Sequence, residues 1–128
     1  MEEKIHLWAA QFYFEIAERK NGEYEKETDV DKRVALRVVA AQNYFYATVN
    51  WIESIFAKNK EHSFNHENRM SKILENRPLF DEEVISLYIE VERNQRNKVT
   101  YRGENGSKYE NIKRLAVLLN EKYGQQIL

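Results

Sequence analysis

Residues 31–59, DKRVALRVVAAQNYFYATVNWIESIFAKN, form the longest stretch of the chain with the periodicity of an α-helix. Asp29 or Asp31 is suited to cap its N-terminus, and at about 1.5 Å per residue the helix is about 40 Å long. Its centre, residues 44–51, is apolar or aromatic on more than one face. Such a helix lies either deep in a bundle or also against a partner chain. The apolar stripe that recurs every three or four residues is Val34, Val38, Ala41, Phe45, Val49, Ile52 and Phe56.

A helical segment also precedes this stretch. Asn21-Gly22 predicts its end, because glycine is common just past a helix C-terminus. The polar residues 22–28, GEYEKET, are then expected to form a loop. The side chains at helical spacing, which we expect to face the core, are Ile5, Trp8, Ala9, Phe12 and Ile16.

Three more helices are predicted after the long one. The first is weak and stops at Arg77-Pro78. The second begins at Asp81, which is suited to cap it, and the third begins with an S-x-x-E capping box at residues 107–110. The apolar residues of the three are Met70, Ile73 and Leu74; Val84, Leu87, Tyr88 and Val91; and Ile112, Leu115, Ala116, Leu119 and Tyr123.

This pattern predicts an all-α fold. The chain has only one proline and four glycines, too few for the many turns of a β-sandwich. Helices joined by short connections favour an antiparallel bundle of four main helices plus a short one. We expect residues 1–128 to form a single domain of this kind.

Composition excludes several classes of protein. The chain has no cysteine, which excludes disulfide scaffolds, thiol catalysis and iron–sulfur clusters. No apolar run approaches the length of a membrane span and no secretory signal opens the chain, so we expect a cytoplasmic protein without membrane contact.

Familiar catalytic and cofactor patterns are also absent. The chain has no phosphate-binding glycine loop, dinucleotide fingerprint or nucleophile elbow, and no cofactor is expected. His62 and His66 stand four residues apart, which two metal ligands on a helix could share, but a solvated loop or helix start explains them better. We therefore predict no metal site.

One segment has an unusual charge. The 128-residue chain has a net charge of −1, but residues 93–114 carry seven Lys and Arg and two acids, a net charge of +5 against −6 elsewhere. Cations at a helix C-terminus stabilise the helix dipole, and one or two suffice for that. The greater density, beside amide side chains at positions 94, 95 and 97, favours a site for a phosphate. Several tyrosines are candidates for stacking against RNA bases: Tyr44, Tyr46, Tyr88, Tyr101 and Tyr109.

Residues 96–101, Arg96-Asn97-Lys98-Val99-Thr100-Tyr101, resemble the signature of the HEPN superfamily. In that family, an Arg, often followed by Asn, is separated by four to six residues from a His near the end of a bundle helix. The long aromatic second helix and the capped last helix are also similar. The resemblance covers most of the chain in architecture and about six residues in motif.

The resemblance implies a homodimer in which two motifs face each other across one cleft. Many members are metal-independent endoribonucleases of toxin–antitoxin or defence systems, often paired with a nucleotidyltransferase, and others bind RNA or nucleotides without cleavage. Arg96 is then expected to hold the scissile phosphate and Asn97 to orient it. Tyr101 stands where the family has its His. The expected catalytic pair is Arg96 and Tyr101, and the expected phosphate-binding residues are Arg93, Arg96, Asn97, Lys98 and Arg102.

Three hypotheses follow for the function. The first is a dimer that binds RNA or a nucleotide phosphate in a cleft centred on Arg96, with weak or no cleavage. The second is an active endoribonuclease that uses Arg96 and Tyr101. The third is a non-catalytic interaction module that pairs with a nucleotidyltransferase or another protein. A tyrosine hydroxyl with a pKa of about 10 is a poor base at neutral pH, which favours the first and third over the second.

Overall fold

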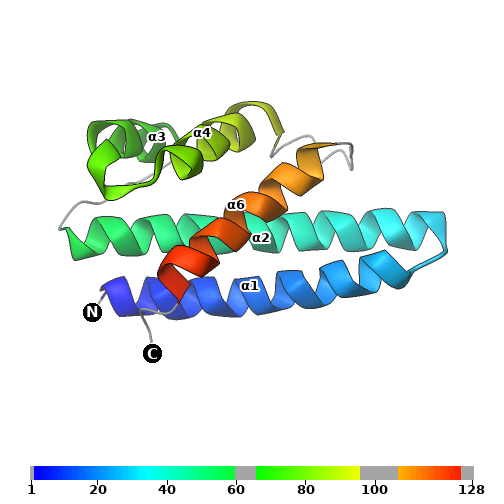
Figure 1. Cartoon of the computed structure of the whole chain (residues 1–128). Helices are drawn as coiled ribbons and strands as arrows, with labels where there is room; N and C mark the ends of the chain where they lie inside the picture. The colour runs from blue at the N-terminus through cyan, green and yellow to red at the C-terminus, as the bar shows by residue number, and fades with distance from the viewer. Residues whose placement is uncertain (1, 60–65, 96–106, 125–128) are drawn as a thin grey trace.

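A computed structural model describes residues 2–59, 66–95 and 107–124. These residues contain no strand, so the all-α fold class predicted from the sequence is confirmed. Figure 1 shows a hairpin of two long helices with the other helices packed against it. The elements are α1 (Glu2–Lys26), α2 (Val30–Lys58), α3 (His66–Glu75), the 3-10 helix η1 (Arg77–Leu79), α4 (Glu82–Glu90), the π-helical segment η2 (Val91–Gln95) and α6 (Ser107–Tyr123).

The hairpin of α1 and α2 is the scaffold of the molecule. The two helices run antiparallel, side by side, and are joined by residues 27–29 (Figure 1). Asp29 caps α2, because its side chain accepts a hydrogen bond from the backbone N–H of Lys32 at 3.0 Å. Of the two caps that the sequence allowed, the structure thus uses Asp29.

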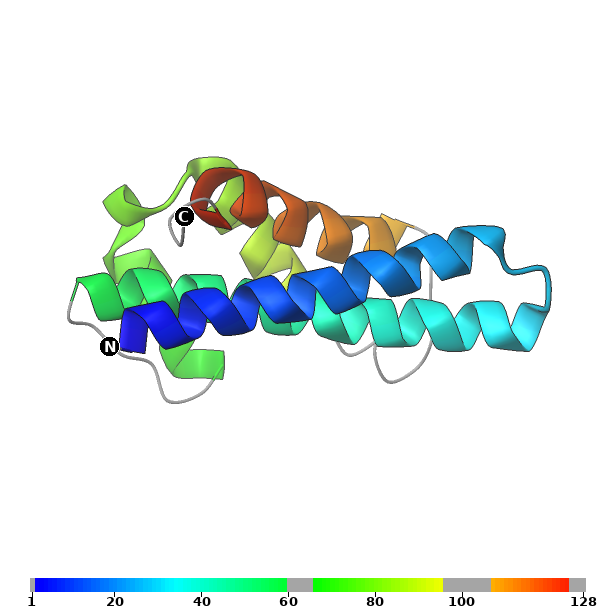
Figure 2. The same ribbon diagram turned by 90° about the horizontal axis from the view of Figure 1, so that it is seen from below.

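Helix α2 is buried on more than one side. Tyr44, Phe45, Trp51 and Phe56 are all almost fully buried. Helix α1 covers one side of α2. Helix α6 crosses one face of the hairpin that these two helices form, as both views show (Figures 1 and 2). The aromatic centre of α2 is therefore explained by its place inside the fold, the first of the two alternatives that its sequence left open.

Helix α1 corrects the sequence prediction of its buried face. Ile5, Trp8 and Phe12 were expected in the core but are exposed, and Ala9 and Ile16 are half-buried. The helix has two apolar stripes on opposite sides. Helices α2 and α6 cover the stripe that the sequence analysis did not choose. The core stripe of α1 is Leu7, Ala10, Phe14 and Ala17.

The end of α1 is a second correction. The helix does not stop at Asn21-Gly22 but continues to Lys26. Its last turns are held by tertiary contacts, since the Tyr109 hydroxyl donates to Asn21 Oδ1 at 2.7 Å. The buried ring of Tyr24 also packs edge-on against Tyr109, with 5.6 Å between ring centroids. These contacts outweigh the cost of about 1 kcal/mol for a glycine inside a helix.

Helices α3 and α4 lie on the side of α2 away from α1 (Figure 1). Helix α3 ends at Glu75, before the predicted stop at Arg77-Pro78. Asp81 precedes α4 as predicted, but its side chain makes no capping hydrogen bond and pairs with Lys122 of α6 instead. This ion pair joins the start of α4 to the end of α6.

Helix α6 closes the core. It begins at Ser107, as the capping box predicted, and the predicted residues Ile112, Leu115, Ala116 and Leu119 are buried. Buried residues of α1, α2, α3, α4, η2 and α6 form one continuous apolar cluster. Among the described residues, no helix combines the length and the apolar character that crossing a membrane requires.

Candidate nucleic-acid interface

The structure places one of the predicted phosphate-binding residues. Arg93 lies on η2, at the end of α4, and its side chain is exposed. Within residues 2–59, 66–95 and 107–124, its guanidinium has no ion-pair partner. The other predicted site residues lie outside the described residues: Arg96, Asn97, Lys98, Tyr101 and Arg102.

Arg93 belongs to a local departure from α-helical geometry. Residues 91–95 adopt a π-helical turn, with hydrogen bonds from residue i to i+5. Such turns are rare and occur often at functional sites, because the wider turn re-aims side chains that a regular helix would point elsewhere. The turn stands directly before the basic residues 96–102.

A chain of buried polar groups anchors this turn. Arg69 of α3 is buried, and its Nε lies 3.3 Å from Glu53 Oε1 of α2. Its Nη1 donates to the Tyr88 hydroxyl at 3.4 Å, and that hydroxyl donates to Glu92 Oε2 at 3.2 Å. The polar chain, defined as Glu53, Arg69, Tyr88 and Glu92, thus connects α2, α3 and α4 to η2.

Burial and the contacts within this polar chain act on the pKa values of Tyr88 and Arg69. Burial raises the pKa of the Tyr88 hydroxyl, which therefore stays protonated and donates to Glu92. Burial acts to lower the pKa of Arg69, but its contacts with Tyr88 and Glu53 outweigh that effect and raise it. Arg69 remains a cation, and the polar chain holds its geometry at neutral pH.

Little in the residue pattern predicts this polar chain. Glu53 and Arg69 are 16 residues apart and belong to different helices. Only Tyr88 and Glu92 show a readable pattern, because side chains four residues apart lie on one helix face. Sequence reasoning therefore found the exposed Arg93 and missed the groups that hold its helix turn.

Two of the basic residues in the segment 93–114 form ion pairs with other helices. Lys113 Nζ lies 3.8 Å from Glu25 of α1, and Arg114 donates to Glu83 of α4 at 2.5 Å. These ion pairs connect α6 to its neighbours. Lys113 and Arg114 are therefore engaged in contacts within the fold, unlike the exposed Arg93 at the start of the segment.

Most of the candidate stacking tyrosines are unavailable to a ligand. Tyr44, Tyr88 and Tyr109 are fully buried, so their rings cannot reach an RNA base. Tyr46 is exposed, but it lies on α2 and packs against Tyr13 at 5.3 Å between centroids. Tyr101, the remaining candidate, lies outside the described residues.

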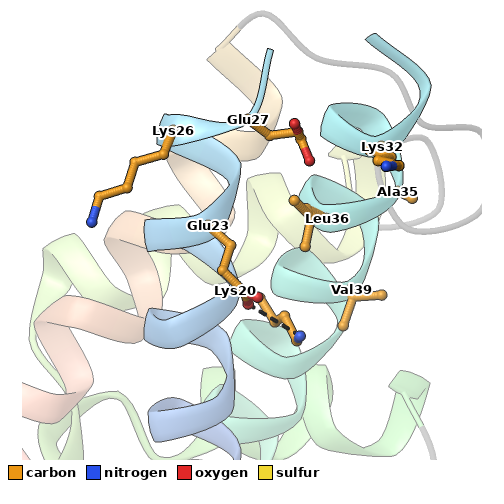
Figure 3. A pocket seen from close by; sticks show the side chains of 8 residues that line it. All are labelled: Lys20, Glu23, Lys26, Glu27, Lys32, Ala35, Leu36 and Val39. Atoms are coloured by element: carbon orange, nitrogen blue, oxygen red, sulfur yellow. Dashed lines mark ion pairs between the residues drawn. The ribbon is translucent and has the colours of Figure 1, made fainter. Parts of the chain in front are cut away.

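The hairpin of α1 and α2 contains a hollow. It is a groove of about 580 Å³ between the end of α1 and the start of α2, floored by Leu36 and Val39 (Figure 3). Lys20 and Glu23 pair across 3.1 Å at its rim, and Lys26 points away from it (Figure 3). Glu27 and Lys32 also line it, so three lysines lie beside two carboxylates. The net charge of this hollow is therefore only +1, against +5 for residues 93–114.

The described part of the chain was also searched for side chains that could bind a metal ion. No group of three or more His, Asp or Glu side chains gathers there in a way that could hold a metal ion. His62 lies outside the described residues.

Comparison of the chain with protein families, with curated proteins and with solved structures finds no match. The interpretation of the basic segment therefore depends on the residues themselves and on the turn that presents Arg93.

Proposed function

We propose that this chain is a HEPN-like homodimeric domain that binds RNA or a nucleotide phosphate through a basic site centred on Arg96. The scaffold is an antiparallel bundle of α1, α2, α4 and α6 with the short α3. The observation that carries the proposal is Arg93, an exposed cation on a π-helical turn that a buried polar chain anchors. The same turn leads directly into the basic residues 96–102.

The chemistry of the segment suits a phosphate. Arginine presents several N–H donors in a planar fork, which matches two oxygens of one phosphate group. Arg93, Arg96 and Arg102 supply this group, Lys98 adds a positive charge, and Asn97 adds an amide donor. Binding of this kind needs no metal ion and falls steeply with salt.

Cleavage is expected to be slow or absent. Cutting RNA at a 2′-hydroxyl needs a group that exchanges protons near neutral pH. Tyr101 stands where the resembling family has its His, and a tyrosine of ordinary pKa, about 10, donates a proton but accepts one poorly. The proposed protein is therefore foremost a binder and at most a weak metal-independent endoribonuclease.

RNA binding is tested by fluorescence anisotropy with a labelled single-stranded RNA at several salt concentrations. We expect wild-type protein to bind at low salt and the R93A/R96A double variant to bind at least about tenfold more weakly. The dependence of log affinity on log salt is expected to fall by about 0.7 for each lost phosphate contact. Arg19→Ala is the matched control, because it removes an exposed arginine from α1, away from η2. Absence of binding by wild-type protein at low salt would refute the proposal.

Cleavage is tested separately, by incubating RNA with the protein in the presence of EDTA. Products that disappear in both Arg96→Ala and Tyr101→Phe would assign a weak nuclease to this pair. Absence of products between pH 6 and 9 would exclude the nuclease and leave the binding function in place.

A further inference from the structure

The outer face of α1 carries apolar side chains that the fold does not cover. Ile5, Trp8 and Phe12 are 57%, 45% and 56% exposed. They are spaced by three and four residues, so they form one stripe along two turns of the helix. The rings of Trp8 and Phe12 lie 5.7 Å apart between centroids, which joins them into a continuous aromatic surface. We call Ile5, Trp8 and Phe12 the outer stripe.

The outer stripe cannot be buried by a small rotation of α1. The core side of this helix carries the buried Ala10 and Ala17, which lie on the opposite side of the helix from Trp8. Turning the outer stripe inward would expose that core side. The helix is therefore apolar on two opposite faces, and only one of them is covered within the chain.

We propose that a second copy of this chain covers the outer stripe, with the two α1 helices packed antiparallel about a two-fold axis. A two-fold interface uses the same surface on both subunits, so a flat aromatic stripe on one helix is suited to pack on itself. This proposal takes over from the proposed function only that the protein is a homodimer, and it departs from the shared cleft that the resemblance implies, because it joins the two copies through α1. It does not rest on the binding of RNA.

Charge along α1 determines the direction and register of the pair. Lys4 and Glu15 are exposed and lie on the same flank of the outer stripe, since residues 11 apart on a helix are almost aligned. In an antiparallel pair about a two-fold axis, each flank faces the same flank of the other helix. Lys4 then lies opposite Glu15 of the second copy, and Glu15 lies opposite its Lys4.

The same register also pairs the aromatic rings. If Trp8 packs against Phe12 of the second copy, the axis passes at residue 10, and pairing Lys4 with Glu15 places it midway between residues 9 and 10. The two positions differ by about 0.75 Å along the helix, so one register satisfies both contacts. In a parallel pair, the charged flank would instead face the flank of Ala9 and Ile16, two side chains that carry no charge.

The area of the stripe indicates a moderate affinity. Each aromatic ring here exposes about half of the roughly 150–250 Å² that such a side chain covers. With Ile5 the stripe contributes about 300 Å² on each copy, less than half of the roughly 800 Å² per partner of a stable interface. The flanking Ala9, Ile16 and the stems of Lys4 and Glu15 add to it. We therefore expect a dimer that dissociates in the micromolar range.

The proposed dimer also places the two phosphate sites. Helix α4 and η2 lie on the side of α2 away from α1 (Figure 1). Two copies joined through α1 would therefore present their Arg93 residues outward, at separate sites, rather than across one shared cleft. We expect one RNA to bind for each protomer.

Sedimentation equilibrium from about 1 to 200 μM tests the dimer. We expect wild-type protein to shift from monomer to dimer over this range and Trp8→Glu to remain monomeric, with an unchanged helical spectrum. Leu74→Glu is the matched control, an exposed apolar residue on α3 that lies away from α1. A wild-type protein that stays monomeric at 200 μM would overturn the proposal, and the outer stripe would then belong to a different protein partner.

Charge-reversed variants test the antiparallel register. Lys4→Glu and Glu15→Lys each place like charges opposite each other in a homodimer, and we expect each alone to dimerise several-fold more weakly. A mixture of the two variants should form a heterodimer, because both charge pairs are then attractive again. A mixture that associates no better than its components would overturn the register. Glu121→Lys, an exposed charge on α6, is the control.

The two proposals fail independently. Trp8→Glu is expected to be monomeric and to retain its affinity for RNA, while R93A/R96A is expected to lose RNA binding and remain a dimer. Loss of RNA binding in Trp8→Glu would contradict separate sites and favour a shared cleft.

Discussion

Replacing Arg69 with methionine tests the polar chain that anchors η2. Arg69 and Glu53 form an ion pair at 3.3 Å, and their side chains are only 10% and 11% exposed. Removing one partner of a buried ion pair costs about 3–5 kcal/mol, because the other charge loses its counter-charge in a medium that hydrates it poorly. The contact of Arg69 with the Tyr88 hydroxyl is longer, at 3.4 Å, and adds little. We therefore expect Arg69→Met to lower the free energy of unfolding by about 3–5 kcal/mol, a large part of the roughly 5–15 kcal/mol typical of a domain.

Urea denaturation followed by circular dichroism measures this loss. Arg77→Met is a matched control, because Arg77 pairs with Glu82 at a shorter 2.7 Å but both side chains are largely exposed. Solvent screens that pair, so its loss should cost less than about 1 kcal/mol. The double variant E53L/R69M removes both buried charges and should be more stable than Arg69→Met alone. The reasoning would be refuted if Arg69→Met cost less than about 1 kcal/mol, or no more than Arg77→Met.

Four other variants and a titration to alkaline pH test the packing of the core by the same measurement. Gly22→Ala should stabilise the chain by about 0.5–1 kcal/mol, because an added Cβ there meets no atom within 4 Å and alanine favours the helix; a loss of stability would contradict the placement of Gly22 inside α1. Thr48→Val should be neutral or stabilising by up to about 1 kcal/mol, since the buried Thr48 hydroxyl has no hydrogen-bond partner among the described residues. Ser54→Ala should instead lose about 1 kcal/mol, because the Ser54 hydroxyl donates to a backbone carbonyl at 2.6 Å; equal effects of the two variants would show this distinction to be wrong. At alkaline pH, stability should be constant up to about pH 10 and then fall by about 4 kcal/mol per pH unit, since the unfolded chain releases tyrosine protons that the folded chain keeps. Tyr44→Phe should reduce that slope by about a third, and a flat profile to pH 11.5 would rule out this cause. Burial raises the pKa most in Tyr44, Tyr88 and Tyr109, which set this slope, and less in Tyr123.

The positions of the helices could be predicted from the sequence, but the buried face of α1 could not. Both of its stripes repeat at helical spacing, and the outer one contains the larger residues, including Trp8 and Phe12. The covered stripe includes Ala10 and Ala17, which allow α1 to approach α2 closely. Periodicity shows that a helix has an apolar face, but the choice between two such faces depends on the shape of its neighbours.

The end of α1 shows a similar limit. Glycine after asparagine is a sound local signal for a helix end, and it was wrong here because Asn21 and Tyr24 both contact Tyr109. Tyr109 lies 88 residues from Asn21 along the chain. A contact at that separation is invisible to local propensity.

The candidate site also has one part that the sequence indicates and one part that it does not. Charge density along the sequence was sufficient to find Arg93, since a cluster of cations is a property of neighbouring residues. The anchoring polar chain depends on Glu53 and Arg69 meeting between two helices, and on a π-helical turn that no residue pattern announces. Sequence reasoning finds the groups that a ligand would touch more readily than the groups that hold them.

The short connection between α1 and α2 has a consequence for how the chain folds. Three residues, 27–29, join the two longest helices, so bringing these helices together costs little loop-closure entropy. Pairing of neighbours along a chain is fast, whereas α6 must return from far along the sequence to reach α1. During synthesis, which proceeds from the N-terminus, both helices of the hairpin are made before residues 93–102, so their pairing can begin first. The last turns of α1 gain their contacts with Tyr109 only once α6 has been made.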